Sequence, residues 1–283
     1  MTPGSDFDNL TGDLEFPQTF GLTDSTLMPT FWLGSSGAYS VCHYDTYGVN
    51  LVVQVFGQKK WTLFPSSDEP NLYSTRLPLE ESTVFSQVNF PNPNLFKYPL
   101  VSNTSPHCVL LNPGDVLFVP RGWWHFVQST ELSPVTCSVN LWLDEPEIDN
   151  GCRLREALTQ FVAFSLLSST SLDKDELLHS AERELYYSSN CGSQLLKNIK
   201  DLAITTQSET VSIFEEKKRK LYDPLWSPLV KCKFEECFSV FSHTQKEHKT
   251  SDTKTLDDKA IINAFLKADV MDLIARHLER QFC

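Results

Sequence analysis

Between Phe31 and about Glu145 the sequence consists of short apolar or alternating runs, each closed by turn residues, and it shows no helical periodicity. Valine and aromatic residues are prominent in these runs, as half-buried pleated surfaces favour. Eight runs qualify as strands: 31–34, 39–45, 50–57, 59–65, 107–113, 114–120, 125–130 and 135–144. So many short strands, with glycine and proline at their joins, predict two facing sheets or a rolled barrel.

The interval 66–106 is too long for an ordinary connection between strands, and loops of this length are often functional. It carries several prolines and aromatic residues, so we expect it to be ordered but irregular. We place it over the mouth of the barrel.

After Asn150 the apolar residues recur with a helical period. We expect helices near 152–167, 171–187, 193–203, 208–221 and 257–280, and a mobile polar linker at 243–255. The chain therefore divides into a loosely structured lead-in (1–30), a β domain (31–147) and a helical C-terminal region (148–283).

The charge and the apolar pattern exclude several classes of function. With 36 acidic and 24 basic residues the net charge is −12, which disfavours broad electrostatic binding of nucleic acid. No apolar run approaches the roughly 20 residues needed to span a bilayer, and the acidic N-terminus is unlike a signal peptide. The eight cysteines lie far apart, unlike those of a disulfide scaffold. We expect an intracellular protein, in the cytoplasm with the nucleus as an alternative.

The residues most informative about chemistry are His43 and Asp45, two positions apart on a predicted strand. Side chains at i and i+2 project from the same face of a strand. A second histidine, His125, opens a late strand. Two histidines and one carboxylate on one side of a metal are typical of non-haem iron(II) oxygenases. His-x-Asp alone also fits a hydrogen-bonded pair in a sheet, but its position in the strand set favours a metal centre.

Three segments resemble the JmjC-domain 2-oxoglutarate oxygenases: GSSGAYSVCHYDTYGVNLVVQVFGQKKWTLFP, GDVLFVPRGWWHFVQS and VTCSVNLWLD. Within that family they are most similar to the hydroxylase branch, which contains the asparaginyl hydroxylase that acts on hypoxia-inducible factor. The similarity covers roughly residues 30–145. It implies a mainly β plus α fold, in which a double-stranded β-helix (cupin or jelly roll) is followed by a helical C-terminal region.

The resemblance also assigns roles to particular residues of this chain. The iron(II) ligands match His43, Asp45 and His125. The lysine that binds the distal carboxylate of 2-oxoglutarate matches Lys59, and a hydroxyl that joins it matches Ser40. The asparagines that line the co-substrate pocket match Asn50 and Asn140, and Trp142 is expected to pack in the core with some exposure to the pocket.

The charges of these groups balance when the site is loaded. Iron(II) and Lys59 bring three positive charges, while Asp45 and doubly ionised 2-oxoglutarate bring three negative ones, and a poorly solvated interior requires such neutrality. The alternative for Lys59 is a solvated charge beside Lys60. Ser40 and Asn50 could instead satisfy backbone groups.

Other candidate ligands are weaker. His107 could compete with His125 as the third metal ligand, but the WWH context favours His125. Cys232, Cys237, His243 and His248 resemble a zinc quartet, yet the gap between the two pairs is far shorter than in a zinc finger, so we expect no tail zinc site.

The resulting hypothesis is an iron(II)- and 2-oxoglutarate-dependent dioxygenase that hydroxylates a protein side chain. The alternative is a weakly active or inactive barrel that binds a partner. The segment LYSTRLPLEESTVFSQVNFPNPNLFKYP resembles relatives associated with a small heat shock protein, which implies that class as a candidate partner. A zinc or manganese cupin isomerase is a third alternative, and the C-terminal helices could form a homodimer.

The stretch before the barrel is shorter than is usual for JmjC hydroxylases. About 30 residues precede the first strand. We expect either a sheet that lacks an outer strand or a truncated form, and both alternatives bear on the activity of this form.

Overall fold

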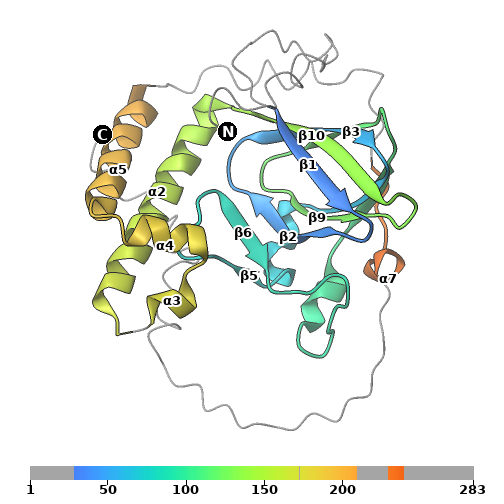
Figure 1. The fold of residues 1–283 in the computed structure, drawn as a ribbon, viewed down its shortest axis with the longest axis horizontal. Helices are drawn as coiled ribbons and strands as arrows, with labels where there is room; N and C mark the ends of the chain where they lie inside the picture. The colour runs from blue at the N-terminus through green and yellow to red at the C-terminus, as the bar shows by residue number, and fades with distance from the viewer. Residues whose placement is uncertain (1–28, 172, 209–228, 239–283) are drawn as a thin grey trace.

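In the computed structural model the described residues are 29–171, 173–208 and 229–238 (Figure 1). They form an antiparallel β-sandwich of the cupin or jelly-roll type, followed by helices, so the predicted fold class is confirmed. The expected helices at 208–221 and 257–280, the linker at 243–255, and nearly all of the lead-in lie outside the described residues. The expected C-terminal homodimer stays a prediction.

Two sheets face each other. The four-stranded sheet has the order β1 (Thr30–Ser35), β10 (Val135–Leu143), β3 (Val49–Phe56) and β8 (Val116–Val119). The six-stranded sheet has the order β5 (Ser74–Thr75), β6 (Thr83–Ser86), β2 (Tyr39–Asp45), β9 (Trp124–Ser129), β4 (Lys59–Phe64) and β7 (His107–Leu111). All eight predicted strands are present, while β5 and β6 were not predicted.

The alternation of side chains along the strands separates an inner layer from an outer one. Between the sheets lies an apolar cluster with Val52 of β3, Trp61 and Leu63 of β4, and Val127 of β9. Because successive residues of a strand point to opposite faces, Lys59 and His125 belong to this inner layer, while Lys60 and Phe126 face outward.

The interval 66–106 covers the outer face of the six-stranded sheet, so its expected place over the barrel mouth was wrong for most of its length. It contains the 3₁₀ turns η2 (Ser66–Asn71) and η3 (Pro99–Asn103) besides β5 and β6. Its apolar residues Leu72, Phe90 and Val101 pack with Trp124 and Phe126 on that outer face. An antiparallel sheet that is apolar on both faces must be covered on both, and this interval provides the second cover.

The helices lie beside the sandwich (Figure 1). They are α2 (Pro146–Ser169), α3 (Lys174–Leu177), α4 (Ser180–Tyr186), α5 (Cys191–Ser208) and α7 (Phe234–Cys237). The predicted helix 171–187 is thus two short helices. Leu154 and Leu158 of α2 are buried against α5, as the helical periodicity predicts. None of the helices in the described part of the chain is both long and apolar enough to cross a bilayer.

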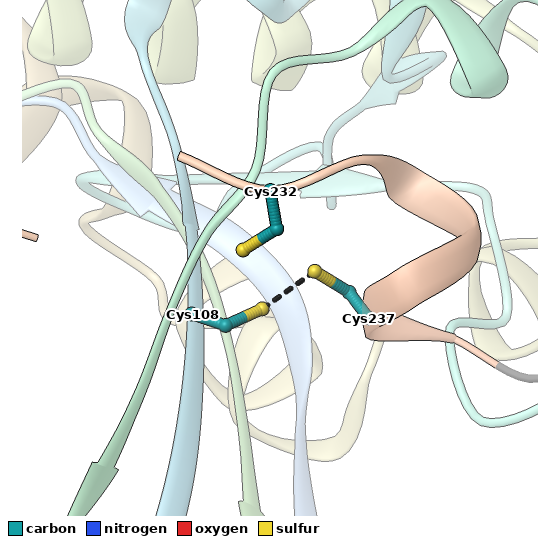
Figure 2. Close-up of side chains that lie close together, drawn as sticks. All are labelled: Cys108, Cys232 and Cys237. Atoms are coloured by element: carbon teal, nitrogen blue, oxygen red, sulfur yellow. Dashed lines mark hydrogen bonds between the residues drawn. The ribbon is translucent and has the colours of Figure 1, made fainter. Parts of the chain in front are cut away.

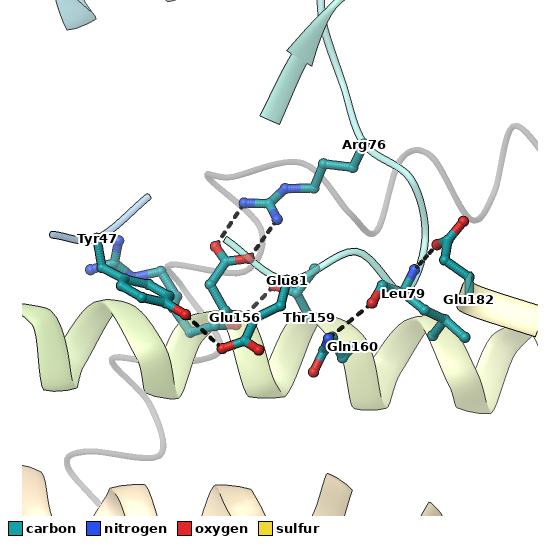
Figure 3. A network of polar contacts seen from close by, with 9 residues as sticks. Tyr47, Arg76, Leu79, Glu81, Glu156, Thr159, Gln160 and Glu182 are labelled. Carbon is teal, nitrogen blue, oxygen red and sulfur yellow. Dashed lines mark hydrogen bonds and ion pairs between the residues drawn. The ribbon is translucent and has the colours of Figure 1, made fainter. Parts of the chain in front are cut away.

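A buried polar network joins α2 and α4 to the interval that follows β5 (Figure 3). The guanidinium of Arg76 donates two hydrogen bonds to the carboxylate of Glu156, at 2.7 and 2.9 Å. The backbone of Leu79 donates to Glu182 Oε1 at 2.6 Å and accepts from Gln160 Nε2 at 2.9 Å. These contacts fix the helices to the sandwich by satisfying backbone groups and pairing charges.

Candidate metal and co-substrate site

The centre of the candidate site is a pair of imidazoles on adjacent strands. His43 of β2 and His125 of β9 are direct register partners, and their ring centroids are 4.2 Å apart. The Nδ1 atom of His43 donates to the carbonyl of Val41 at 2.6 Å, and that of His125 donates to the carbonyl of Trp123 at 3.0 Å. Because a carbonyl only accepts, each Nδ1 carries a proton, which leaves Nε2 as the atom that can bind a metal; this orientation is found in metal-binding histidines.

The inner position of His125 keeps its imidazole neutral. Its side chain is buried, and desolvation, followed by the nearby His43, lowers the pKa of His125 to about 3. Trp61 stacks on the same ring with centroids 5.7 Å apart. A neutral imidazole is the form that binds metal, so this nitrogen is available as a ligand at neutral pH.

Asp45 lies on the same face of β2 as His43, as the i, i+2 spacing predicts. Burial raises the pKa of the Asp45 carboxyl, while His43 and a bond from Trp142 oppose the rise. That bond, from Trp142 Nε1 to Asp45 Oδ2, is long at 3.4 Å. Asp45 also lines a cavity of about 220 Å³ with Tyr47, Gly48, Ser82, Trp142 and Asp144. The Asp45 carboxylate therefore borders this cavity.

The three side chains do not form a closed ligand set. Within the described residues, the group whose ligand atoms all lie within 4.8 Å of one another consists of three cysteines elsewhere in the fold. His43, Asp45 and His125 therefore span a wider triangle. The structure brings the two imidazoles together and leaves the carboxylate turned toward Trp142.

Lys59 lies in the inner layer, so the alternative prediction that its ammonium is a solvated surface charge is wrong. Only 7% of the residue is exposed. Its Nζ atom crosses to the opposite sheet and donates to the carbonyl of Trp32 at 3.1 Å and to Ser138 Oγ at 2.8 Å. Burial lowers the pKa of Lys59. By contrast, Lys60 faces outward and donates to the carbonyl of Cys237 at 2.8 Å.

Ser40 reaches the inner layer because of an irregularity in β2. The register between β2 and β9 shifts between Ser40 and His43, where three steps along β2 match two steps along β9. This β-bulge lets Ser40 pair with the inward-facing Val127 and His43 pair with the inward-facing His125. Simple alternation would place residues three apart on opposite faces.

Several polar oxygens in the inner layer have no hydrogen-bond partner. Asn50 is 4% exposed and Asn140 is 5% exposed, and the Oδ1 atoms of both are unpartnered, as is Oε1 of Gln54. Buried polar atoms are rarely left unpaired without a ligand or water. The inner layer thus fits a small polar guest, in keeping with a co-substrate pocket.

Part of this polar lining was not predicted from the sequence. Gln54, Ser129, Thr136 and Ser138 are all buried polar residues of the inner layer. Ser129 Oγ and Thr136 Oγ1 share a hydrogen bond of 2.7 Å. The available signal was the alternation on 50–57, which places Gln54 on the same face as Asn50.

His107 is separated from His125 by a strand. Both are register partners of Leu63 on β4, so they lie roughly 10 Å apart across the sheet. The His107 ring packs edge-on against Trp123 with centroids 5.5 Å apart. This placement removes His107 as a competitor of His125 for the position beside His43.

The fold and this polar barrel interior define the class of protein. Residues 2–148 match the family described as a cupin-like domain, and the chain belongs to that family. Its similarity to JmjC-domain proteins is confirmed by curated relatives. Over 159 residues it is 49% identical to "HSPB1-associated protein 1" of Bos taurus, covering 56% of this chain and 31% of that protein.

Two further relatives extend the comparison. The human protein of the same name is 51% identical over 137 residues, which are 48% of this chain and 28% of that protein. "Lysine-specific demethylase JMJ31" of Arabidopsis thaliana is 37% identical over 168 residues, covering 56% of this chain and 29% of that protein. The chain spans less than a third of the length of these three relatives. JmjC cupin proteins are typically iron(II)- and 2-oxoglutarate-dependent oxygenases.

Proposed function

We propose that the protein is an iron(II)- and 2-oxoglutarate-dependent dioxygenase that hydroxylates a protein side chain. The observation that carries the proposal is the imidazole pair of His43 and His125, with both Nδ1 atoms held by backbone carbonyls. A pair of metal-ready imidazoles beside a carboxylate, inside a cupin barrel, is the donor set of non-haem iron oxygenases.

In this proposal His43, Asp45 and His125 hold the iron. The donor chemistry fits, because neutral imidazole nitrogens and one carboxylate suit iron(II). Closing the wide triangle requires side-chain movement, and Asp45 is the side chain held most weakly, by its 3.4 Å bond from Trp142. When bound, the iron would supply the oxygen-activating chemistry that the protein side chains lack.

Lys59 is the proposed partner of the distal carboxylate of 2-oxoglutarate. Its charge is buried between the sheets with only neutral hydrogen-bond acceptors, Trp32 O and Ser138 Oγ. A dicarboxylate would supply the missing negative charge. Asn50 and Asn140 would offer their amides to the same guest, and Ser40 faces it because of the bulge. A zinc or manganese isomerase would not need this buried lysine.

Substrate is proposed to approach through the cavity beside Asp45. The cavity opens next to the carboxylate and is lined by Tyr47, Ser82 and Asp144 among others. Inside the barrel, Trp61 stacks on His125 and belongs with Leu63 to the apolar cluster between the sheets. In this proposal a substrate side chain enters beside the carboxylate, and the apolar side chains packed near His125 exclude water, which positioned oxidation requires.

The test is succinate production by the full chain supplied with iron(II), ascorbate and 2-oxoglutarate. His125→Ala should abolish turnover, and His107→Ala is the matched control that should retain it. A mass-spectrometric search of cell extract for peptides carrying one added oxygen would then identify the substrate. Turnover in His125→Ala equal to that of the wild type would refute the proposal.

A second candidate function is protein binding with little or no turnover. The name of the mammalian relatives, HSPB1-associated protein 1, supports a small heat shock protein as the partner. Binding of purified small heat shock protein that persists in His125→Ala, together with no thermal shift on adding 2-oxoglutarate, would favour this function over the oxygenase.

A further inference from the structure

Three cysteines from distant parts of the chain meet on the outer side of the six-stranded sheet (Figure 2). Cys108 lies on β7, Cys237 ends α7, and Cys232 lies just before that helix. Their Sγ atoms all lie within 4.8 Å of one another, and those of Cys108 and Cys237 are 2.6 Å apart. Figure 2 shows the three sulfurs pointing toward a common centre.

The cluster is built by the docking of residues 229–238 against the edge of the sheet. The backbone of Cys232 donates to the carbonyl of Pro106 at 2.8 Å, and Lys231 forms a β-bridge with His107. Phe234 and Phe238 pack against Phe90 in the outer apolar cluster. Backbone pairing on one side and aromatic packing on the other hold the thiols in place.

The environment suits a thiolate-bound metal. Zinc bound by thiolates at about 2.3 Å in a tetrahedron places the sulfurs about 3.8 Å apart. The three sulfurs lie within 4.8 Å of one another, and zinc binding would move those of Cys108 and Cys237 apart from 2.6 Å. Three thiolates around Zn²⁺ carry a net charge of −1. The ammonium of Lys60 donates to the carbonyl of Cys237 at 2.8 Å, which places one cation beside that charge.

The cluster is separate from the imidazole pair. Alternation on β4 directs Lys59 and Trp61 into the barrel, whereas Thr62 faces outward and contacts Cys108 Sγ at 3.5 Å. A metal at the cysteines would thus lie on the opposite face of the sheet from His125, and it would not depend on the oxygenase proposal.

We propose that Cys108, Cys232 and Cys237 bind one structural zinc ion as thiolates. Binding releases the three thiol protons to solvent and leaves the fourth coordination position for a further donor. The expectation of no zinc site in the tail rested on Cys232 and Cys237 alone with two later histidines. The contribution of Cys108 from the barrel was invisible in the sequence spacing. The zinc would fasten residues 229–238 to the sheet.

The test is elemental analysis of untagged, reduced full-length protein. We expect one equivalent of zinc in the wild type and the loss of that equivalent in Cys108→Ser, Cys232→Ser and Cys237→Ser. Cys191→Ser, which alters a buried cysteine of α5 outside the cluster, is the matched control and should keep the zinc. His125→Ala should also keep it, which separates this site from the imidazole pair.

A second measurement guards against misfolded variants. Cobalt(II) added to the metal-free wild type should give thiolate-to-cobalt charge-transfer absorption, which Cys232→Ser should weaken and Cys191→Ser should leave unchanged. The proposal is overturned if the wild type holds no zinc, if Cys232→Ser holds as much as the wild type, or if peptide mapping finds Cys108 and Cys237 joined as a disulfide in place of the metal.

Discussion

Replacing Lys59 by methionine should separate the role of the buried ammonium in binding from its role in stability. Methionine keeps the length of the apolar stem and removes the charge. In the protein without co-substrate two effects oppose each other. The change leaves Ser138 Oγ and the carbonyl of Trp32 without a donor, and it removes the cost of burying an ammonium that has no carboxylate partner.

The two effects differ in size between the free and the loaded protein. Each lost hydrogen bond costs about 1 kcal/mol, and relief of the buried charge offsets part of that, so the free energy of unfolding should change by less than about 2 kcal/mol. In the loaded protein the distal carboxylate of the co-substrate would lose the ammonium assigned to it, which costs about 3–5 kcal/mol. That corresponds to a Kd for 2-oxoglutarate weakened by roughly 150- to 4,000-fold.

The assay is calorimetric titration of the iron- or manganese-loaded protein with 2-oxoglutarate, alongside urea unfolding of the free protein. Lys60→Met is the matched control, because it removes the same charge from the neighbouring residue on the outer face. We expect Lys60→Met to bind 2-oxoglutarate like the wild type. Wild-type affinity in Lys59→Met, or an equal loss in Lys60→Met, would contradict the assignment of the inner lysine to the co-substrate.

Three further predictions concern stability. Glu156→Gln should lower the free energy of unfolding by about 3–5 kcal/mol, because it removes the carboxylate that pairs with the guanidinium of Arg76, in a contact whose side chains are only 10% and 4% exposed; urea unfolding measures the loss. In metal-free protein the folded-state pKa of His125 is about 3, against 6.5 when exposed. As the pH falls below 6.5, His125 binds a proton in the unfolded state but not in the folded state. The free energy of unfolding therefore has its full contribution from His125 above pH 6.5 and loses up to about 1.4 kcal/mol per pH unit as the pH drops toward 3. His125→Gln should remove that slope in unfolding measured against pH. Gly57→Ala should lower the melting temperature more than Gly114→Ala: both glycines have positive φ, but an added Cβ at Gly57 meets a backbone carbonyl at 2.7 Å, whereas at Gly114 nothing lies within 4 Å.

Each of these has its own control. Lys197→Met breaks an ion pair to Asp201 in which both side chains are more than half exposed, so it should lower the free energy of unfolding far less than Glu156→Gln does. A loss as large as that of Glu156→Gln would show that burial does not set the cost. Identical pH profiles for the wild type and His125→Gln would contradict the lowered pKa. Equal melting temperatures of the two glycine variants would contradict the close contact at Gly57.

Much of the barrel was predictable because its strands carry their signals locally. Alternation and the turn residues at Gly57 and Gly114 delimit the runs, and the i, i+2 rule places Asp45 with His43. The placement of 66–106 was not predictable in the same way. Its strand β6 has four residues and is defined by pairing with β2, and its position depends on which face of the sheet lacks a cover.

The remaining site features depend on contacts between distant segments. The inward orientation of Ser40 depends on a bulge whose register is set against β9, and a single strand read by alternation does not reveal it. Lys59 finds its acceptors on the opposite sheet, at Trp32 and Ser138. Cys108 joins Cys232 and Cys237 only once residues 229–238 have docked.

The direct pairing of His43 with His125 has a consequence for how such a barrel can diversify. The separation of the two rings is set by the spacing of neighbouring strands in a hydrogen-bonded ladder, and connecting segments do not enter into it. Insertions in the connections, or replacement of the helices, would therefore alter which molecules reach the site. The distance between the His43 and His125 rings would stay the same. Relatives could in this way acquire new targets without rebuilding their histidine pair.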